Sequence, residues 1–247
     1  NLLRTAAEQA QAYDAPIRFI FPSTIAIYGV DPREKTTLPP LREFQALRPI
    51  TMYGANKLYC EAMGRYYGRY YRSITRGDRR APIDFRCLRL PGIISADTVP
   101  VGGTSDYVPE MIHASARGEA CTCFVREDTS LPWMMMPECV QAILQLAEAP
   151  VLSRCVYNVA SFSATAGTFA QAVRKHNSAS DHLISMLWVH AKTHVQFDRL
   201  VKFCEPDLLQ RVDSFFNGVQ AIIDLLGCLS VILRQFGHES LCSPTLQ

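Results

Sequence analysis

The stretch Arg48-Pro-Ile-Thr-Met-Tyr-Gly-Ala-Asn-Lys-Leu-Tyr-Cys-Glu61 places a tyrosine and a lysine four residues apart, after a proline and at the start of a helical run. On an α-helix, residues i and i+4 share a face, so the polar ends of Tyr53 and Lys57 can converge. A nearby ammonium stabilises a phenolate and so prepares a tyrosine for proton transfer at neutral pH. Taken alone the pair is a weak signal, because an amphipathic helix with an unrelated Tyr and Lys gives the same pattern.

Length and composition narrow the class of protein. The chain has 247 residues, 48% of them hydrophobic and 19% charged, which is typical of a globular protein with a substantial core. The formal net charge of only +2 gives no support for binding nucleic acid or an anionic membrane, and we predict neither partner. Nine cysteines without a C-x-x-C pair indicate reduced thiols rather than disulfides or a metal site. We therefore predict a cytoplasmic or mitochondrial matrix protein that is not secreted.

Two kinds of segment alternate along residues 1–176. Short apolar and β-branched runs predict strands at residues 17–21, 84–90, 121–125 and 155–160. Segments rich in helix-forming residues predict helices at residues 1–13, 52–71, 110–117, 138–148 and 168–176. Residues 131–137 are expected to lead into the fourth of these helices. Strands and helices alternating at this spacing indicate an α/β fold with a parallel sheet.

Residues 177–247 differ in character from the rest. Strand signals end there and helical apolar runs dominate, so we predict a mainly helical tail after a first domain of residues 1–176. The apolar run 218–233 contains Asp224 and falls short of the roughly 20 residues that a membrane span needs. His190 and His194 share a helix face, but without further ligands at matching spacing we predict no metal there.

Hydroxyls and a Pro-Gly turn follow the first two predicted strands. Ser23 and Thr24 come after the strand at 17–21, and Pro91 begins a turn after the strand at 84–90. In parallel sheets, ligands bind beyond the carboxyl ends of the strands, so these residues are expected to lie around one site. A hydroxyl there can orient an alcohol or carbonyl while Tyr53 moves its proton and Lys57 supports the tyrosine.

Taken together, the motifs resemble the extended short-chain dehydrogenase/reductase family, and within it the NAD-dependent L-threonine 3-dehydrogenases. The resemblance covers residues 1 to about 176. It rests on the segments Phe21–Gly29, Arg48–Lys57, Asp84–Asp97, Gly102–Tyr107 and Thr122–Pro132. Sugar-nucleotide epimerases of the same superfamily share the first two. The resemblance implies a partial Rossmann-like, doubly wound parallel sheet with a small substrate-domain portion.

The resemblance also implies a role for each matching residue. Thr24 matches the catalytic Ser/Thr. Tyr53 looks like the base that takes the proton from the threonine hydroxyl, and Lys57 like its partner, which also holds the nicotinamide ribose of NAD. The turn against the nicotinamide is matched by Pro91, Gly92 and Ile93, and the substrate contacts by Ser23, Thr24, Thr104 and Ser105. The implied reaction is NAD-dependent oxidation of L-threonine to 2-amino-3-oxobutanoate, in a homodimer formed through the Tyr53 helix.

The chain departs from the family pattern in three ways. The glycine-rich turn that cradles the pyrophosphate is missing together with the strand before it, so we expect an unpaired sheet edge and a truncated cofactor site. Residues 72–82 include an insertion, and nothing after about residue 176 matches the family. Two alternatives therefore remain open, a sugar-nucleotide epimerase or dehydratase and a catalytically inactive remnant.

Overall fold

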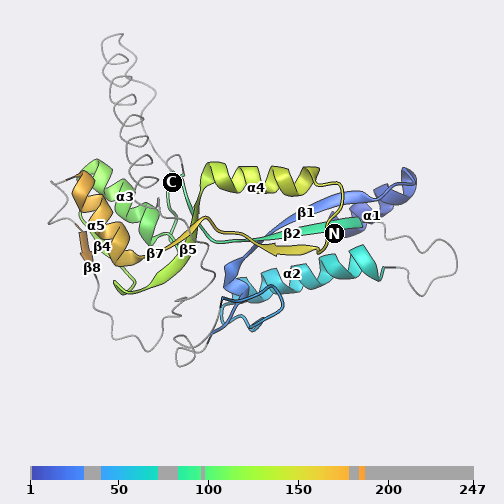
Figure 1. Cartoon of the computed structure of the whole chain (residues 1–247), viewed down its shortest axis with the longest axis horizontal. Helices are drawn as coiled ribbons and strands as arrows, with labels where there is room; N and C mark the ends of the chain where they lie inside the picture. The colour runs from blue at the N-terminus through green and yellow to red at the C-terminus, as the bar shows by residue number, and fades with distance from the viewer. Residues whose placement is uncertain (1, 31–39, 72–82, 96–97, 178–183, 187–247) are drawn as a thin grey trace, which may run out of the picture.

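The computed structural model describes residues 2–30, 40–71, 83–95, 98–177 and 184–186 (Figure 1). Its helices are α1 (Leu2–Ala12), η1 (Ile25–Ile27, a 3₁₀ turn), α2 (Met52–Arg69), α3 (Tyr107–Arg117), α4 (Met136–Glu148) and α5 (Ala166–His176). Its strands are β1 (Ile17–Thr24), β2 (Ile83–Leu90), β3 (Gly92–Ile94), β4 (Cys121–Cys123), β5 (Ser130–Met135), β6 (Val156–Asn158), β7 (Phe162–Thr165) and β8 (Ile184–Met186). The α/β class predicted from the sequence is confirmed.

The first sheet has the strand order β1-β2-β6, and both pairings are parallel. Strands β1 and β2 pair over their whole length, from Ile17 opposite Ile83 to Thr24 opposite Leu90. Helix α2 lies along one face of this sheet and α4 along the other, so the sheet is covered on both sides (Figure 1). This covering buries most of β2, whereas β1 is only half-buried along much of its length.

Helix α2 begins at a polar cap and lies unusually close to the sheet. The Thr51 hydroxyl accepts a hydrogen bond from the Gly54 amide at 3.0 Å, a cap that contributes about 1 kcal/mol to helix stability. The side of α2 that faces the sheet carries small residues. A Cβ atom on Gly64 would lie 2.1 Å from the Phe85 ring, so only glycine permits this approach. The close packing fixes where the first turn of α2, with Tyr53, meets the end of β1.

The second sheet has the order β3-β5-β7, with β3 parallel and β7 antiparallel to β5. A hydrophobic core lies between this sheet and helices α3 and α5, around the fully buried Trp133 and the nearby rings of Tyr107 and Phe169. Strand β3 begins two residues after β2 ends, so the two sheets are joined at the Pro91–Gly92 turn.

Two expectations about the strands were wrong. Residues 131–137 were expected only to lead into a helix, but β5 occupies most of this segment. Pro132 lacks an amide donor and so argues against a strand, yet it precedes Trp133–Met135, the part of β5 that pairs with β3. A short strand also occurs after Asn177, because β8 pairs with β4. Most of the predicted tail, including His190, His194 and Asp224, lies outside the described residues.

The cysteines and the helices of the described residues bear on disulfides and on membrane spans. The cysteines that the structure describes, Cys60, Cys87, Cys121, Cys123, Cys139 and Cys155, are all free thiols. Within those same ranges, no helix is both long enough and apolar enough to cross a membrane.

Candidate active site

The carboxyl end of β1 brings the predicted hydroxyls and the Pro-Gly turn together. Because β1 and β2 pair in parallel, Ser23 lies opposite Arg89 and Thr24 opposite Leu90. Pro91 follows directly, so it emerges beside Thr24 at the same edge of the sheet. Ser23 and Thr24 are both buried, at 3% and 9% exposure.

The first turn of α2 packs against η1, the turn that follows Thr24. A Cβ on Gly54 would lie 2.1 Å from the Ala26 carbonyl oxygen, which shows how closely the two turns approach. The Lys57 ammonium donates a hydrogen bond of 2.7 Å to the carbonyl of Pro22, within β1. Its nitrogen lies 5.7 Å from the centroid of the Tyr53 ring. The structure therefore places Tyr53 and Lys57 at the same end of β1 as Ser23 and Thr24.

The hydroxyls of Ser23 and Thr24 differ in the hydrogen bonds that they can still form with a ligand. Ser23 donates its proton to a carboxylate oxygen of Glu61 at 2.6 Å, so toward a ligand it can only accept. Thr24 accepts from the Ala26 amide at 3.1 Å, which leaves its own O–H for donation. Of the two, Thr24 is the hydroxyl that can donate to a substrate oxygen.

A buried ion pair holds the helix and the sheet together behind these residues. The Glu61 carboxylate receives two parallel hydrogen bonds from Arg89, at 2.9 Å and 2.7 Å, and both side chains are 0% exposed. Arg65 lies 3.9 Å from the same carboxylate. Burial opposes the charge on Arg89, but the bonds to Glu61 offset it and the pKa of the guanidinium is raised. Glu61 thus links α2, the end of β1 and strand β2 through one carboxylate.

The network continues from Arg89 to the loop after β1. The Arg89 guanidinium also donates to the Tyr28 hydroxyl at 2.7 Å and to the Glu43 carbonyl at 2.6 Å. Burial raises the pKa of Tyr28, so this phenol keeps its proton, which it donates to Asn158 at 2.6 Å. Sequence reasoning missed this network. The signals were present, since Glu61 is four residues after Lys57 and Arg89 interrupts an apolar strand.

The remaining predicted site residues lie at the junction of the sheets and before α3. Pro91 and Gly92 are buried and Ile93 is half-buried. A Cβ on Gly92 would lie 2.4 Å from the Trp133 ring, so the glycine is required by core packing. Thr104 and Ser105 lie in the turn before α3, where the Asp106 carboxylate accepts from the amides of Val101 and Gly103. Contact of Thr104 and Ser105 with a substrate stays a prediction.

The residues present fit the nicotinamide end of a dinucleotide. An ammonium has three donors, and the Pro22 carbonyl takes one of those on Lys57, so two can bond ribose hydroxyls. Pro91–Ile93 border the same edge. No glycine-rich turn of the kind that holds a pyrophosphate occurs among residues 1–247.

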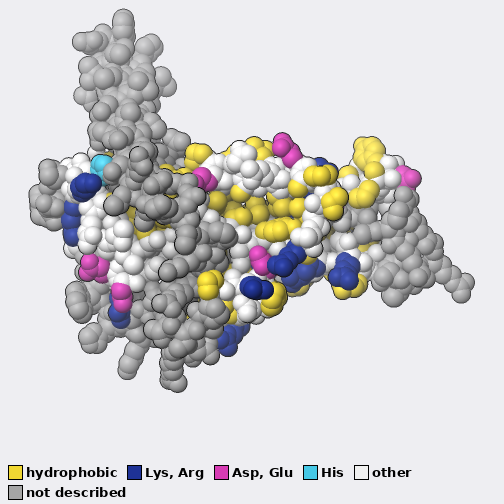
Figure 2. Space-filling view, in the orientation of Figure 1, with side chains coloured by type: hydrophobic (Ala, Val, Ile, Leu, Met, Phe, Trp, Pro, Cys, Tyr) yellow, Lys and Arg dark blue, Asp and Glu magenta, His cyan; other side chains and the backbone are white. Residues whose placement is uncertain are grey.

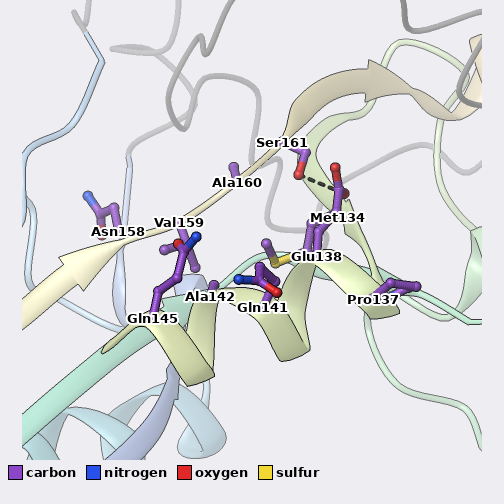
Figure 3. A pocket seen from close by; sticks show the side chains of 10 residues that line it. All are labelled: Met134, Pro137, Glu138, Gln141, Ala142, Gln145, Asn158, Val159, Ala160 and Ser161. Atoms are coloured by element: carbon purple, nitrogen blue, oxygen red, sulfur yellow. Dashed lines mark hydrogen bonds between the residues drawn. The ribbon is translucent and has the colours of Figure 1, made fainter. Parts of the chain in front are cut away.

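A shallow pocket of about 490 Å³ lies between α4 and the segment that follows β6 (Figure 3). Helix α4 covers the face of the first sheet that is opposite α2 (Figure 1). Its one carboxylate, Glu138, accepts from the Met135 amide at 2.8 Å and from the Ser161 hydroxyl at 2.7 Å. These bonds cap α4 and tie it to the segment before β7. These contacts give Glu138 a structural role in the pocket wall.

Comparison with known proteins identifies the family. The sequence profile of the NAD dependent epimerase/dehydratase family matches residues 1–160, well over half of the chain. The chain belongs to this family. Family membership connects the chain with NAD(P)-dependent enzymes.

Several proteins similar to this epimerase/dehydratase family member are named L-threonine dehydrogenases. The mitochondrial L-threonine 3-dehydrogenase of Bos taurus is 40% identical over 179 residues, covering 71% of this chain and 42% of that protein. The solved L-threonine 3-dehydrogenase of Trypanosoma brucei is 27% identical, with a TM-score of 0.65 over 90% of this chain and 67% of the other. A GalE-like L-threonine dehydrogenase from Cupriavidus necator is 30% identical, with a TM-score of 0.59 over 88% of this chain and 65% of the other. The chain spans less than half the length of the Bos taurus relative.

Proposed function

We propose that the chain carries the acid/base half of a site that oxidises L-threonine to 2-amino-3-oxobutanoate with NAD. The observation that supports this best is the position of the Lys57 ammonium, between the Pro22 carbonyl and the Tyr53 ring at the end of β1. The 40% identity to the Bos taurus enzyme supports L-threonine as the substrate.

In this proposal Tyr53 accepts the proton of the substrate hydroxyl. Tyr53 takes this proton as a phenolate and becomes neutral, and the Lys57 ammonium stabilises the phenolate before the transfer, which is the usual effect of a cation within about 6 Å. Thr24 donates its O–H to the same substrate oxygen and so orients it toward Tyr53. The nicotinamide of NAD supplies the hydride acceptor, and the chain's own residues supply position and proton transfer.

We propose that the residues at this edge of the sheet also contact the cofactor and the substrate. We assign the nicotinamide ribose to Lys57 and the border of the nicotinamide to Pro91, Gly92 and Ile93. Ser23, an acceptor in this structure, faces the substrate beside Thr24. Thr104 and Ser105 contact the polar groups of the amino acid from a turn that Asp106 holds in shape.

We further propose a homodimer through the outer face of α2. Exposed apolar side chains recur there at helical spacing, at Met52, Tyr59 and Tyr66, each at least 50% exposed. A row of exposed apolar side chains on one helix face is more than the isolated apolar residues of an ordinary surface, and it fits a second copy of the same helix. A mitochondrial location is proposed from the names of the Bos taurus and Sus scrofa relatives.

Two other functions remain candidates. A sugar-nucleotide epimerase or dehydratase is favoured by the family and by a relative from Staphylococcus haemolyticus, named an uncharacterized epimerase/dehydratase, which is 31% identical over 70% of this chain. An inactive remnant is the second alternative, and a chain that neither binds NAD nor turns over would favour it. The first shares Tyr53 and Lys57 with the proposed enzyme and differs in its substrate.

Calorimetric titration of the chain with NAD tests the proposal at the cofactor stage. We expect a dissociation constant between micromolar and sub-millimolar, about −8 to −5 kcal/mol. Lys57→Met should weaken binding at least tenfold, while Lys175→Met, which removes an exposed lysine on α5, should leave it unchanged. Turnover is then screened with L-threonine and with a UDP-sugar. Activity with the UDP-sugar alone would favour the epimerase, and absence of NAD binding would favour the remnant.

A further inference from the structure

A large cavity lies beside the C-terminal half of α2, away from the candidate active site. It has a volume of about 860 Å³ and lies between α2, the N-terminal part of β2 and the loop that leads into β6. Volumes of this size are typical of pockets for small organic ligands. Its apolar floor includes the buried side chains of Ile83, Phe85 and Val156. Nothing in the proposed dehydrogenase chemistry uses this cavity.

Three arginines border the cavity from different elements. Arg65 and Arg69 come from α2, and Arg154 comes from the loop before β6. Basic side chains gather beside apolar ones on this face of the molecule, over α2 and β6 (Figure 2). Guanidinium groups from separate elements that border one cavity are the arrangement that binds phosphate and carboxylate oxygens.

The acidic groups near these arginines do not neutralise all of them. Arg65 lies 3.9 Å from Glu61, but that carboxylate already receives two bonds from Arg89 and one from Ser23. Arg154 pairs with Glu43 at 3.1 Å, and its side chain is 56% exposed, so this pair is weak.

The other carboxylate of the cavity wall is engaged elsewhere. Asp84 accepts two hydrogen bonds from the buried Arg86, at 3.0 Å and 2.6 Å. Arg86 in turn donates to the last carbonyls of α4, so this group is part of the fold. Among the described residues that line the cavity, these three guanidiniums therefore stand against one carboxylate not engaged in the fold, that of Glu43, and the cavity favours an anion.

Two exposed aromatic rings complete the wall. Phe44 is 67% exposed and Tyr70 is 53% exposed, and both border the cavity. The Arg69 guanidinium lies 5.5 Å from the centroid of the Tyr70 ring, so a charge and an aromatic face are presented together. A flat ring system can stack on such side chains while its anionic group reaches the arginines.

The cavity is separate from the acid/base residues. Arg65 lies twelve positions after Tyr53 in α2, which is about 18 Å along the helix at 1.5 Å per residue. A ligand bound at the arginines therefore does not occupy the substrate position beside Thr24.

We propose that this cavity is a second ligand site, which binds a nucleotide through its phosphate and its base. Arg65, Arg69 and Arg154 bind the phosphate, and Phe44 and Tyr70 stack against the base. The net charge of +2 gives no support for a nucleic acid polymer as the ligand.

The test is calorimetric titration of the full chain with adenosine 5′-monophosphate, adenosine and inorganic phosphate. The proposal predicts that the nucleotide binds at least tenfold more tightly than either part alone. The double variant Arg69→Ala, Arg154→Ala should weaken nucleotide binding at least tenfold. The matched control Arg117→Ala, which removes an exposed arginine paired with Glu119, should change it less than twofold.

Further outcomes decide whether the site is real and separate. Lys57→Met should leave nucleotide binding unchanged, and a loss there would place the ligand at the candidate active site and overturn the proposal. Equal binding of inorganic phosphate would refute the role of the rings. Equal binding of adenosine would refute the role of the arginines. No detectable binding of the nucleotide would refute the site as a whole.

Discussion

Removal of the Arg89 guanidinium tests how the buried ion pair organises the candidate active site. In Arg89→Met, the Glu61 carboxylate remains fully buried and loses both of its close hydrogen bonds from the guanidinium. Arg65, at 3.9 Å and partly exposed, replaces little of that interaction. Breaking a buried pair in this way costs about 3–5 kcal/mol.

Urea unfolding followed by circular dichroism measures this cost. At an m-value of about 2 kcal/mol per M, the expected loss lowers the urea midpoint by roughly 2 M. The double variant Glu61→Leu, Arg89→Met removes both charges together. It should recover much of the stability, because no buried charge is left unpaired.

The double variant also controls for simple loss of volume in the core. A midpoint for Arg89→Met within about 0.5 M of the parent, near 1 kcal/mol, would refute the reasoning. So would a double variant that is as unstable as the sum of its single changes, because the two residues would then act independently.

Three further predictions concern packing, pH and assembly. Gly64→Ala should destabilise the chain by about 1–3 kcal/mol in urea unfolding, because the new methyl group meets the Phe85 ring at 2.1 Å; Ala62→Gly on the exposed side should cost only about 1 kcal/mol. Burial raises the pKa of the Cys87 thiol above its ordinary value of 9.0, so at high pH the folded chain keeps a proton that the unfolded chain loses. The free energy of unfolding should therefore fall as pH rises above about 9. A fall of equal slope in Cys87→Ala would contradict this cause. Tyr66→Glu should convert a dimer to a monomer in light scattering, whereas Tyr13→Glu, an exposed tyrosine beyond the end of α1, should not; a monomeric parent chain would refute the proposed interface.

The parts of the fold that the sequence predicted are those with strong local signals. Helix α2 has a threonine cap and a long run without proline, and β1 and β2 are short runs rich in apolar and β-branched residues. Strand β5 was missed because Pro132 reads as a strand breaker, although only the residues after it pair with β3. Strand β8 has three residues, too few to give a pattern of its own.

The sequence predicted that Tyr53 and Lys57 lie close together, but it did not predict the hydrogen bonds behind them. The spacing of Tyr53 and Lys57 follows from helix geometry, so their shared position could be predicted. The Glu61–Arg89 pair joins residues 28 positions apart, and no local pattern specifies which charges meet inside a core. Likewise, the different roles of the Ser23 and Thr24 hydroxyls depend on Glu61 and on the start of η1.

The most direct test of the central claim is the rate of L-threonine-dependent reduction of NAD by the parent chain, Tyr53→Phe and Tyr59→Phe. The two variants each lose one exposed hydroxyl from the same helix, and only Tyr53 lies beside Lys57. The proposed chemistry predicts turnover by the parent, a loss of at least about 10²-fold in Tyr53→Phe and less than a twofold change in Tyr59→Phe. Absence of turnover in the parent, or turnover that survives in Tyr53→Phe, would contradict it.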